Sequence, residues 1–256
     1  MSPEKIGYSM IPTNWQLQTP ISAIVFDCDG TLSAIEGIDE LARMNGVYEA
    51  VAALTAKAMG ETGLNLETYQ ERLALVKPNQ QQLETLSHAY LTNCVQDALP
   101  VIQTLMRLNK SIYIVSAGLN PAVTLFGESL NIPRENIYAV DLKFDAHGNY
   151  LDFDHTSPLV NLNGKRVIVS DLKLRHETIL HIGDGLNDYD AHDLVTRFVG
   201  FGGFFYRENL EKLCKYYIKT PSLVSLLPLA LTQDEYTQLS PSELDLYLKG
   251  IEYFSI

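Results

Sequence analysis

The sequence predicts an α/β fold: a doubly wound, mostly parallel, Rossmann-like sheet with a helical cap inserted after the first strand. Three observations support this prediction. Short apolar runs typical of buried strands alternate with amphipathic stretches typical of helices, as in parallel sheets covered by helices. Two of these runs lead directly into acidic clusters. A long interval without a strand separates the first run from the second.

Six apolar runs are the expected strands of the main sheet. They are short and rich in Ile, Val, Phe and Tyr, which suits strands that are buried on both faces. They lie at residues 21–26, 111–115, 137–140, 179–182, 198–201 and 216–218. Two further runs, at 142–144 and 150–153, flank a five-residue loop that contains Gly, which predicts an antiparallel hairpin.

The interval from about residue 37 to residue 94 interrupts this alternation. It holds helical patterns at 38–44, 47–59, 66–76 and 80–91. A crossover between neighbouring strands needs far fewer residues. We therefore expect a discontinuous Rossmann-like catalytic core from 1–36 and 95–231, with a helical cap from 37–94. Two capped helix starts predict a C-terminal helical extension at 232–256, which serves packing or homodimer formation.

Composition restricts the partners of this chain. Among its 256 residues, 31 are acidic and 19 basic, which gives a net charge of -12. This charge and the lack of a basic run argue against nucleic acid and anionic membranes as partners. No apolar run approaches the ~20 residues of a membrane span, and no secretory signal pattern is evident. Three widely spaced cysteines favour a reduced, cytoplasmic location.

The acidic clusters lie at the ends of two expected strands. Asp27 and Asp29 follow the first strand, and Asp184 and Asp188 follow the run at 179–182. Open α/β sheets bind ligands at the carboxyl ends of their strands, so these four side chains are expected to share one crevice. Each like-charge pair at ~4 Å costs about 4 kcal/mol at an effective dielectric of about 20. A bound cation relieves this repulsion, and carboxylates suit Mg2+.

The first cluster is suited to phosphoryl transfer. Asp27 is placed to attack phosphorus, and Asp29 to protonate the leaving alkoxide and later to activate water. Gly30 lets the backbone pass close to a bound group. A Ca2+-binding EF-hand loop starting at Asp27 is excluded. Such a loop needs an acidic or amide residue at its fifth position, Gly at its sixth and Glu at its twelfth, and these positions are Thr31, Leu32 and Ile38.

Two further elements favour phosphate binding. Ser116 ends an expected strand, and its hydroxyl and the backbone N–H groups that follow, of Ala117 and Gly118, can donate to phosphoryl oxygens. Lys165 offers a cation at a helix start. A serine-hydrolase elbow requires Gly where Ile114 stands, so that class is excluded.

Neighbouring patterns have simpler interpretations. A Walker loop requires Gly at the position of Leu159, and a dinucleotide-binding loop requires Gly at the position of Asp188. Cys28 alternates with the two aspartates along the chain and is expected to pack away from them. His181, inside a strand, is expected to be a core or edge residue.

These elements, in this order, resemble the motif set of haloacid dehalogenase superfamily phosphatases. The set comprises Asp27-x-Asp29-Gly30-Thr31, Ser116, Lys165 and Gly183-Asp184-x-x-Asn187-Asp188. The chain further resembles the phosphoserine phosphatases of that superfamily, because Glu36-Gly37-Ile38-Asp39-Glu40 follows the first motif at their spacing. The resemblance extends over roughly residues 21–227.

The resemblance implies a Mg2+-dependent phosphomonoesterase that hydrolyses O-phospho-L-serine in serine biosynthesis. In the core it implies Asp27 as nucleophile and Asp29 as acid/base. The implied residues around the ion and the phosphoryl group are Asp27, the Asp29 carbonyl, Asp184 and Asp188 for Mg2+, and Ser116, Lys165 and Asn187 for phosphate. In the cap it implies that Glu36 binds the substrate ammonium, Arg72 binds its carboxylate, and Met59 lines the pocket.

The chain also departs from that family. Asn65 stands where an aromatic substrate-contacting cap residue is expected, Ala117 replaces a usual Gly, and the tail from about Thr232 is extra. These departures affect the choice of substrate. One alternative is therefore a phosphatase or phosphotransferase for another small phosphorylated metabolite. Another is an inactive scaffold that binds a protein through its tail.

Overall fold

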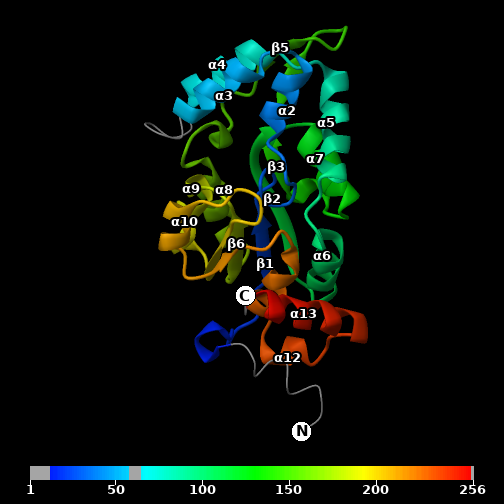
Figure 1. The fold of residues 1–256 in the computed structure, drawn as a ribbon, viewed down its shortest axis with the longest axis vertical. Coiled ribbons are helices and arrows are strands. Elements are labelled where there is room, and N and C mark those ends of the chain that lie inside the picture. Colours follow the sequence, from blue (N-terminus) through cyan, green and yellow to red (C-terminus); the bar gives the residue numbers. More distant parts are fainter. Residues whose placement is uncertain (1–11, 58–64, 255–256) are drawn as a thin grey trace.

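The computed structural model describes residues 12–57 and 65–254, and its main sheet has six parallel strands (Figure 1). The strand order is β3-β2-β1-β6-β7-β8. The bounds are Ala23–Phe26 for β1, Ser111–Leu119 for β2, Ile137–Val140 for β3, Ile179–Gly183 for β6, Arg197–Phe201 for β7 and Tyr217–Ile218 for β8. All neighbouring pairs are parallel, which confirms the predicted doubly wound α/β fold.

The order of the strands places the site. β1 lies between β2 and β6, and Phe26, its last residue, is in register with Ile114 on β2 and Ile182 on β6. The chain moves outward on one side of β1 and then returns to its other side. Ligands bind at such a reversal, outside the carboxyl ends of the strands. The segments that follow β1 and β6 therefore meet at one edge.

Strand β2 is longer than predicted. It continues from Val115 to Leu119, with a register shift against β3 between these two residues. Ser116 was predicted to end the strand and instead lies inside it. The additional pairing of Leu119 with Val140 explains why the strand continues past this polar residue.

Helices cover the sheet on both faces, and its strands are apolar because they are enclosed. All the residues of β1, β6 and β7 are buried. The core helices are α6 (Ala98–Arg107), α7 (Ala122–Ser129), α8 (Gly164–Lys173), α9 (Leu186–Tyr189), α10 (Glu208–Leu213) and α11 (Leu226–Ala230). In the part of the chain that the structure describes, no helix is both long and apolar enough to cross a membrane.

Four helices occupy the interval between β1 and α6, as predicted. They are α2 (Gly37–Met44), α3 (Tyr48–Lys57), α4 (Leu66–Val76) and α5 (Gln80–Thr92). The helical pattern expected at 47–59 ends within residues that lie outside the described part. Figure 1 shows α3 and α4 beyond the carboxyl edge of the sheet, while α5 also packs on α7 of the core. The domain limits at 36, 94 and 231 stay a prediction.

The predicted hairpin consists of β4 (Leu142–Phe144) and β5 (Tyr150–Phe153), which pair in antiparallel fashion. It contacts the helices after β1 at two points. The Gln80 N–H donates to the Gly148 carbonyl at 2.9 Å. The rings of Phe153 and Tyr69 lie 5.3 Å apart. The hairpin therefore fastens α4 and α5 to the core.

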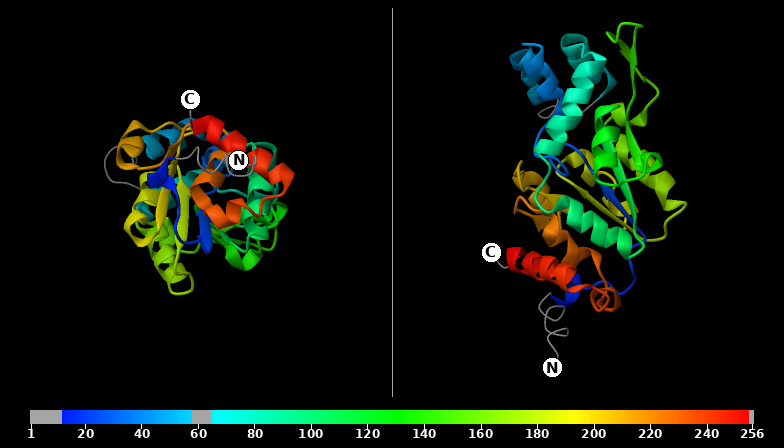
Figure 2. Two further views of the ribbon diagram at one scale, coloured as in Figure 1. Left: turned by 90° about the horizontal axis from the view of Figure 1, so that it is seen from below. Right: turned by 90° about the vertical axis from the view of Figure 1, so that its right-hand side faces the viewer.

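The C-terminal segment forms α12 (Gln233–Tyr236) and α13 (Pro241–Phe254), at the end of the molecule opposite α3 and α4 (Figures 1 and 2). The predicted capped start at Thr232 is present as a reciprocal capping box with Glu235. Glu235 also accepts from the buried Lys110 at 2.5 Å. The ring of Tyr247, fully buried on α13, packs 4.9 Å from that of Tyr236. The tail is therefore part of the folded body.

Candidate active site

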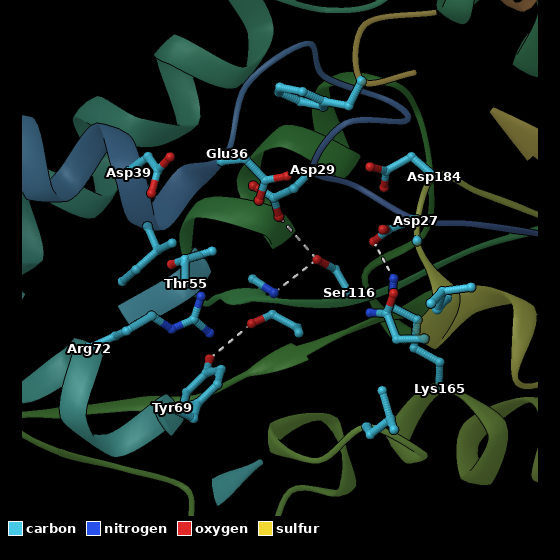
Figure 3. Close-up of a pocket in the computed structure, with 18 of the residues that line it drawn as sticks. Asp27, Asp29, Glu36, Asp39, Thr55, Tyr69, Arg72, Ser116, Lys165 and Asp184 are labelled. Carbon is cyan, nitrogen blue, oxygen red and sulfur yellow. Dashed lines mark hydrogen bonds and ion pairs between the residues drawn. The ribbon is translucent and has the colours of Figure 1, made fainter. Parts of the chain in front are cut away.

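Three carboxylates meet at the carboxyl edge of the sheet. Asp27 follows β1, and Asp184 and Asp188 follow β6. Each offers an oxygen within 4.8 Å of the others, and all three residues are buried. Figure 3 shows Asp27 and Asp184 facing the same space. Carboxylate oxygens are the ligands that a hard divalent cation prefers, and a group of close carboxylates needs positive charge. These three residues therefore fit Mg2+.

Lys165 compensates part of this charge. Its Nζ lies 2.7 Å from Oδ1 of Asp27 and 2.7 Å from Oδ1 of Asp188, and the residue is only 3% exposed. Burial alone would raise the pKa of Asp188, but Lys165 and His181 lower that pKa to about 2. Burial and the charge of Asp188 hold the pKa of Asp27 well above its ordinary value despite Lys165. One lysine therefore does not neutralise the cluster.

A second cation stands on the other side of the cluster. Arg207, in the loop after β7, donates from both Nε and Nη2 to Oδ2 of Asp184, at 3.3 and 3.0 Å. Burial raises the pKa of Asp184 to about 6, and Asp188 adds to the increase while Arg207 opposes it. Repulsion between the carboxylates thus persists with both cations in place.

The carboxylate of Asp29 points away from the other three. Its Oδ1 accepts from the Gly37 N–H at 2.6 Å and from the Tyr90 hydroxyl at 2.8 Å. Its Oδ2 lies 3.4 Å from Oγ of Ser116. Of the four carboxylates predicted to share a crevice, three lie within 4.8 Å of one another, and Asp29 lines the cavity beside them. Any contact of Asp29 with a metal would therefore involve its backbone carbonyl. This separation leaves the Asp29 side chain free for proton transfer.

The end of β2 provides polar groups beside Asp29. Gly118 N–H donates to Oγ of Ser116 at 2.9 Å, which orients that hydroxyl. The Tyr69 hydroxyl, from α4, donates to the Ala117 carbonyl at 2.9 Å. Gly30 has φ of 72°, and a Cβ there would lie 2.8 Å from Cγ of Asp184, so only glycine fits this close approach.

A cavity of about 950 Å3 connects these groups to the helices after β1. Its lining includes predicted residues from the core and the cap alike: Asp27, Asp29, Glu36, Arg72, Ser116, Ala117, Gly118, Lys165, Asp184 and Asn187. Figure 3 shows Arg72 and Thr55 at the end of the cavity farther from Lys165. The structure therefore brings the catalytic and substrate-binding candidates into one space.

Beyond the aspartate cluster the cavity carries charges of both signs, with Glu36 beside Asp29 and Arg72 farther away (Figure 3). Burial, with the charges of Asp29 and Asp184, raises the pKa of Glu36 to about 8. Burial lowers the pKa of Arg72, whose guanidinium lies 5.7 Å from the Tyr69 ring centroid. Within the described residues, Nε of Arg72 is buried without a hydrogen-bond partner. Such an unsatisfied donor is costly unless a ligand accepts from it.

The other predicted site residues have different positions. Asp188 and Gly30 are not on the cavity wall. Asp188 contacts Lys165, which is on the wall, and Gly30 lies too close to the Asp184 side chain for a Cβ to fit. Asn65 is also absent from the wall, because its side chain caps α4 by accepting from Thr68 N–H at 2.9 Å. Met59 lies outside the described residues.

The sequence interpretation missed four residues that support the site. They are Tyr69, Tyr90, His181 and Arg207, of which His181 was expected only to be a core or edge residue. Nε2 of His181 lies 3.4 Å from Oδ1 of Asp188. Cys28 is buried and absent from the wall, as predicted. Only the helical spacing of Tyr69 and Arg72, which places both on one face of α4, could have indicated one of the four.

Comparisons with known proteins agree with this geometry. The family model of haloacid dehalogenase-like hydrolases matches residues 21–191. The phosphoserine phosphatase of Homo sapiens is 34% identical over 198 residues, covering 77% of this chain and 88% of that protein. The chloroplastic phosphoserine phosphatase of Arabidopsis thaliana is 33% identical over 216 residues, covering 81% and 72%.

Solved structures show the same fold. A phosphoserine phosphohydrolase-like protein from Francisella tularensis superposes with a TM-score of 0.71 at 24% identity, covering 82% of this chain and 98% of that chain. A substrate-bound phosphoserine phosphatase has a TM-score of 0.71 at 23% identity, with the same coverage. From the family model, the curated relatives and the site together, this chain belongs to the haloacid dehalogenase-like hydrolases and is a phosphoric monoester hydrolase.

Proposed function

We propose that this chain hydrolyses O-phospho-L-serine to L-serine and phosphate with Mg2+, through an aspartyl-phosphate on Asp27. The observation that carries this proposal is the shared cavity: Glu36 and Arg72 line the same space as Asp27 and Lys165. A ligand with a phosphate at one end and an ammonium and a carboxylate at the other matches these charges. The curated relatives named phosphoserine phosphatase support the same substrate.

The reaction has two steps. A carboxylate oxygen of Asp27 forms a bond to phosphorus while the bond from phosphorus to the serine oxygen breaks, and Asp29 gives that oxygen a proton. In the second step Asp29 takes a proton from water, which attacks phosphorus and releases Asp27. Lys165, whose Nζ lies 2.7 Å from Oδ1 of Asp27, stabilises the negative charge that develops on the phosphoryl oxygens.

Asp27, Asp184 and Asp188 would hold the Mg2+. When bound, the ion supplies positive charge that neutralises the phosphoryl oxygens. The hydroxyl of Ser116, the N–H groups of the end of β2 and the amide of Asn187 would position the phosphate. These groups are neutral donors, so they orient the phosphate without adding charge.

Arg72 and Glu36 would select the amino acid. The guanidinium of Arg72 can donate to a carboxylate in a bidentate manner and thereby satisfy its buried Nε. Glu36 would accept from the ammonium, whose positive charge favours the ionised form of this carboxyl group. Both contacts fix the orientation of the substrate, and tight positioning of reacting groups contributes strongly to rate.

One observation favours a second candidate. The cavity volume of about 950 Å3 is near the upper limit for small-molecule sites, and Asn65 does not reach its wall. A larger phosphomonoester, or transfer of the phosphoryl group to an acceptor other than water, would use the same core residues. Such a reaction would differ only in its dependence on Glu36 and Arg72.

A phosphate-release assay tests the proposal. The wild type is supplied with Mg2+ and offered O-phospho-L-serine, phosphoethanolamine or glycerol phosphate. Phosphoethanolamine lacks the carboxylate, and glycerol phosphate lacks both the ammonium and the carboxylate. We expect O-phospho-L-serine to give the highest kcat/KM, EDTA to abolish release, and Asp27→Asn to be folded but inactive. A preference for either simpler ester would refute phosphoserine as the substrate.

Variants of the cap sharpen this test. Arg72→Gln should lower kcat/KM for O-phospho-L-serine by roughly 100-fold, because it removes a charge-assisted pair, and should change it little for glycerol phosphate. Arg43→Gln is the matched control, since this arginine on α2 is exposed and absent from the cavity wall. Equal losses for both esters in Arg72→Gln would contradict the assignment of Arg72 to the carboxylate.

A further inference from the structure

Tyr90 reaches from α5 to the carboxylate of Asp29. Its hydroxyl donates to Oδ1 of Asp29 at 2.8 Å. The tyrosine is fully buried, and its ring lies 5.5 Å from that of Phe126 on α7. Since α5 and α7 pack against each other, the hydroxyl is held from a rigid part of the molecule. No part of the reaction described above uses this residue.

A second donor meets the same oxygen. The Gly37 N–H donates to Oδ1 of Asp29 at 2.6 Å. A Cβ at Gly37 would lie 2.0 Å from the hydroxyl oxygen of Tyr90, so a side chain there would displace the tyrosine hydroxyl. Glycine at this position therefore allows both donors to approach one carboxylate oxygen. Two donors on one oxygen restrict rotation of the carboxylate about its bond to Cβ.

The other oxygen is left for chemistry. Oδ2 of Asp29 lies 3.4 Å from the hydroxyl of Ser116, which is beyond the usual length for a hydrogen bond between two oxygens. Figure 3 shows this oxygen on the side of Asp29 that faces Ser116, and both residues line the cavity. The two oxygens of Asp29 are thus unequal: one is bound to the protein scaffold and one faces the substrate space.

We propose that Tyr90 is a positioning residue that fixes the carboxyl group of Asp29 so that Oδ2 is the atom that exchanges the proton. In the first step the bond from phosphorus to the ester oxygen breaks and the proton on Oδ2 passes to that oxygen, while Asp27 forms its bond to phosphorus. In the second step Oδ2 takes a proton from the attacking water. The proposal rests on the acid/base role of Asp29 in the proposed function.

The inference predicts a dependence on the leaving group. An alkyl ester such as O-phospho-L-serine expels a strongly basic oxygen and needs the acid, whereas p-nitrophenyl phosphate expels a stable phenolate and does not. We expect Tyr90→Phe to lower kcat/KM, which reports the transfer of the phosphoryl group to Asp27, about 10-fold or more for O-phospho-L-serine and less than about 2-fold for p-nitrophenyl phosphate. The second step, hydrolysis of the phosphorylated Asp27, is common to both esters and does not enter kcat/KM.

Two further variants complete the experiment. Tyr113→Phe removes another buried tyrosine hydroxyl, one that lies 2.8 Å from Nε2 of His176 and away from the cavity. Tyr113→Phe should change kcat/KM for the two esters by the same factor, whatever its effect on thermal stability. Gly37→Ala, which would displace the Tyr90 hydroxyl, should reproduce the selective loss seen in Tyr90→Phe.

The outcomes separate this inference from the proposed function. Equal losses of kcat/KM for both esters in Tyr90→Phe, or no loss for either, would overturn the positioning role while the wild type stays active. If the wild type released no phosphate from either ester, the proposed function would fail and this inference with it. A selective loss in both Tyr90→Phe and Gly37→Ala supports the inference.

Discussion

Replacing Lys165 with methionine tests the charge balance of the site most directly. The side chain keeps its length and apolar stem, but its ammonium is lost. In the native protein that ammonium is buried and lies 2.7 Å from carboxylate oxygens of both Asp27 and Asp188. The variant therefore leaves two buried carboxylates without their shared cation.

The size of the effect follows from these distances. Two unit charges 2.7 Å apart attract by about 6 kcal/mol at an effective dielectric of about 20. Desolvation of the buried ammonium offsets several kcal/mol of the attraction to the two carboxylates. Removing one partner of a buried pair typically costs about 3–5 kcal/mol, so we expect this decrease in the free energy of unfolding of the metal-free protein. Loss of charge stabilisation should also lower kcat by roughly 100-fold or more.

Urea denaturation with and without Mg2+, together with kcat for O-phospho-L-serine, measures both effects. Lys110→Met is the matched control, because Lys110 is equally buried and pairs at 2.5 Å with Glu235 on α12, a helix at the opposite end of the molecule. Both variants should lose stability. Only Lys165→Met should lose turnover and recover part of its stability when Mg2+ is added. Similar kcat values in the two variants would refute the reasoning.

Two other substitutions test the cap and the tail. The pKa of Glu36 is raised to about 8, so the contribution of this group to stability is complete below about pH 4.5 and is lost as the pH rises through 8. Denaturation of the metal-free protein at several pH values should show this decline in the free energy of unfolding. The substitution Glu36→Gln should make the decline less steep. A decline of equal slope in Glu36→Gln would contradict the assignment. Tyr247→Ala should lower the free energy of unfolding by about 3–5 kcal/mol, because it empties a fully buried aromatic position, while kcat/KM for O-phospho-L-serine stays unchanged. A large fall in kcat/KM would indicate that α13 affects the site.

The sequence was sufficient for the sheet because most strand positions are buried beneath helices and are therefore apolar. Strand β3 has the predicted bounds, and β1, β6, β7 and β8 differ from them by one or two residues. The end of β2 was missed because Ser116 and Gly118 are polar or small, which usually ends a strand. Pairing with β3 decided its length, and such pairing is not visible in a local pattern.

The site was predictable where the motif lies on one strand end and less so where distant segments meet. The metal cluster followed from two strand termini that the topology places side by side. Tyr90 and Arg207 were missed because each reaches the site from a segment with no distinctive pattern, α5 and the loop before α10. The direction of Asp29 depended on Gly37 and Tyr90 together, and no spacing rule relates a backbone N–H to a side chain so far along the chain.

The distribution of charge explains how a divalent cation would help this site to accept a phosphate. Among the described residues that line the cavity, the carboxyl groups of Asp27, Asp29, Glu36, Asp39, Asp184 and Asp190 outnumber the cations of Arg72, Lys165 and Arg207. A doubly charged phosphate entering this space meets net repulsion. Burial is the main cause of the raised pKa values of Asp27, Asp184 and Glu36, and neighbouring carboxylates raise them further. An ion held by the aspartate cluster would reverse the local sign where the phosphate must lie. Glu36, which Figure 3 shows beside Asp29, would stay available to an ammonium, and Arg72 to a carboxylate. An excess of acidic groups in the cavity would therefore suit the zwitterionic substrate proposed above.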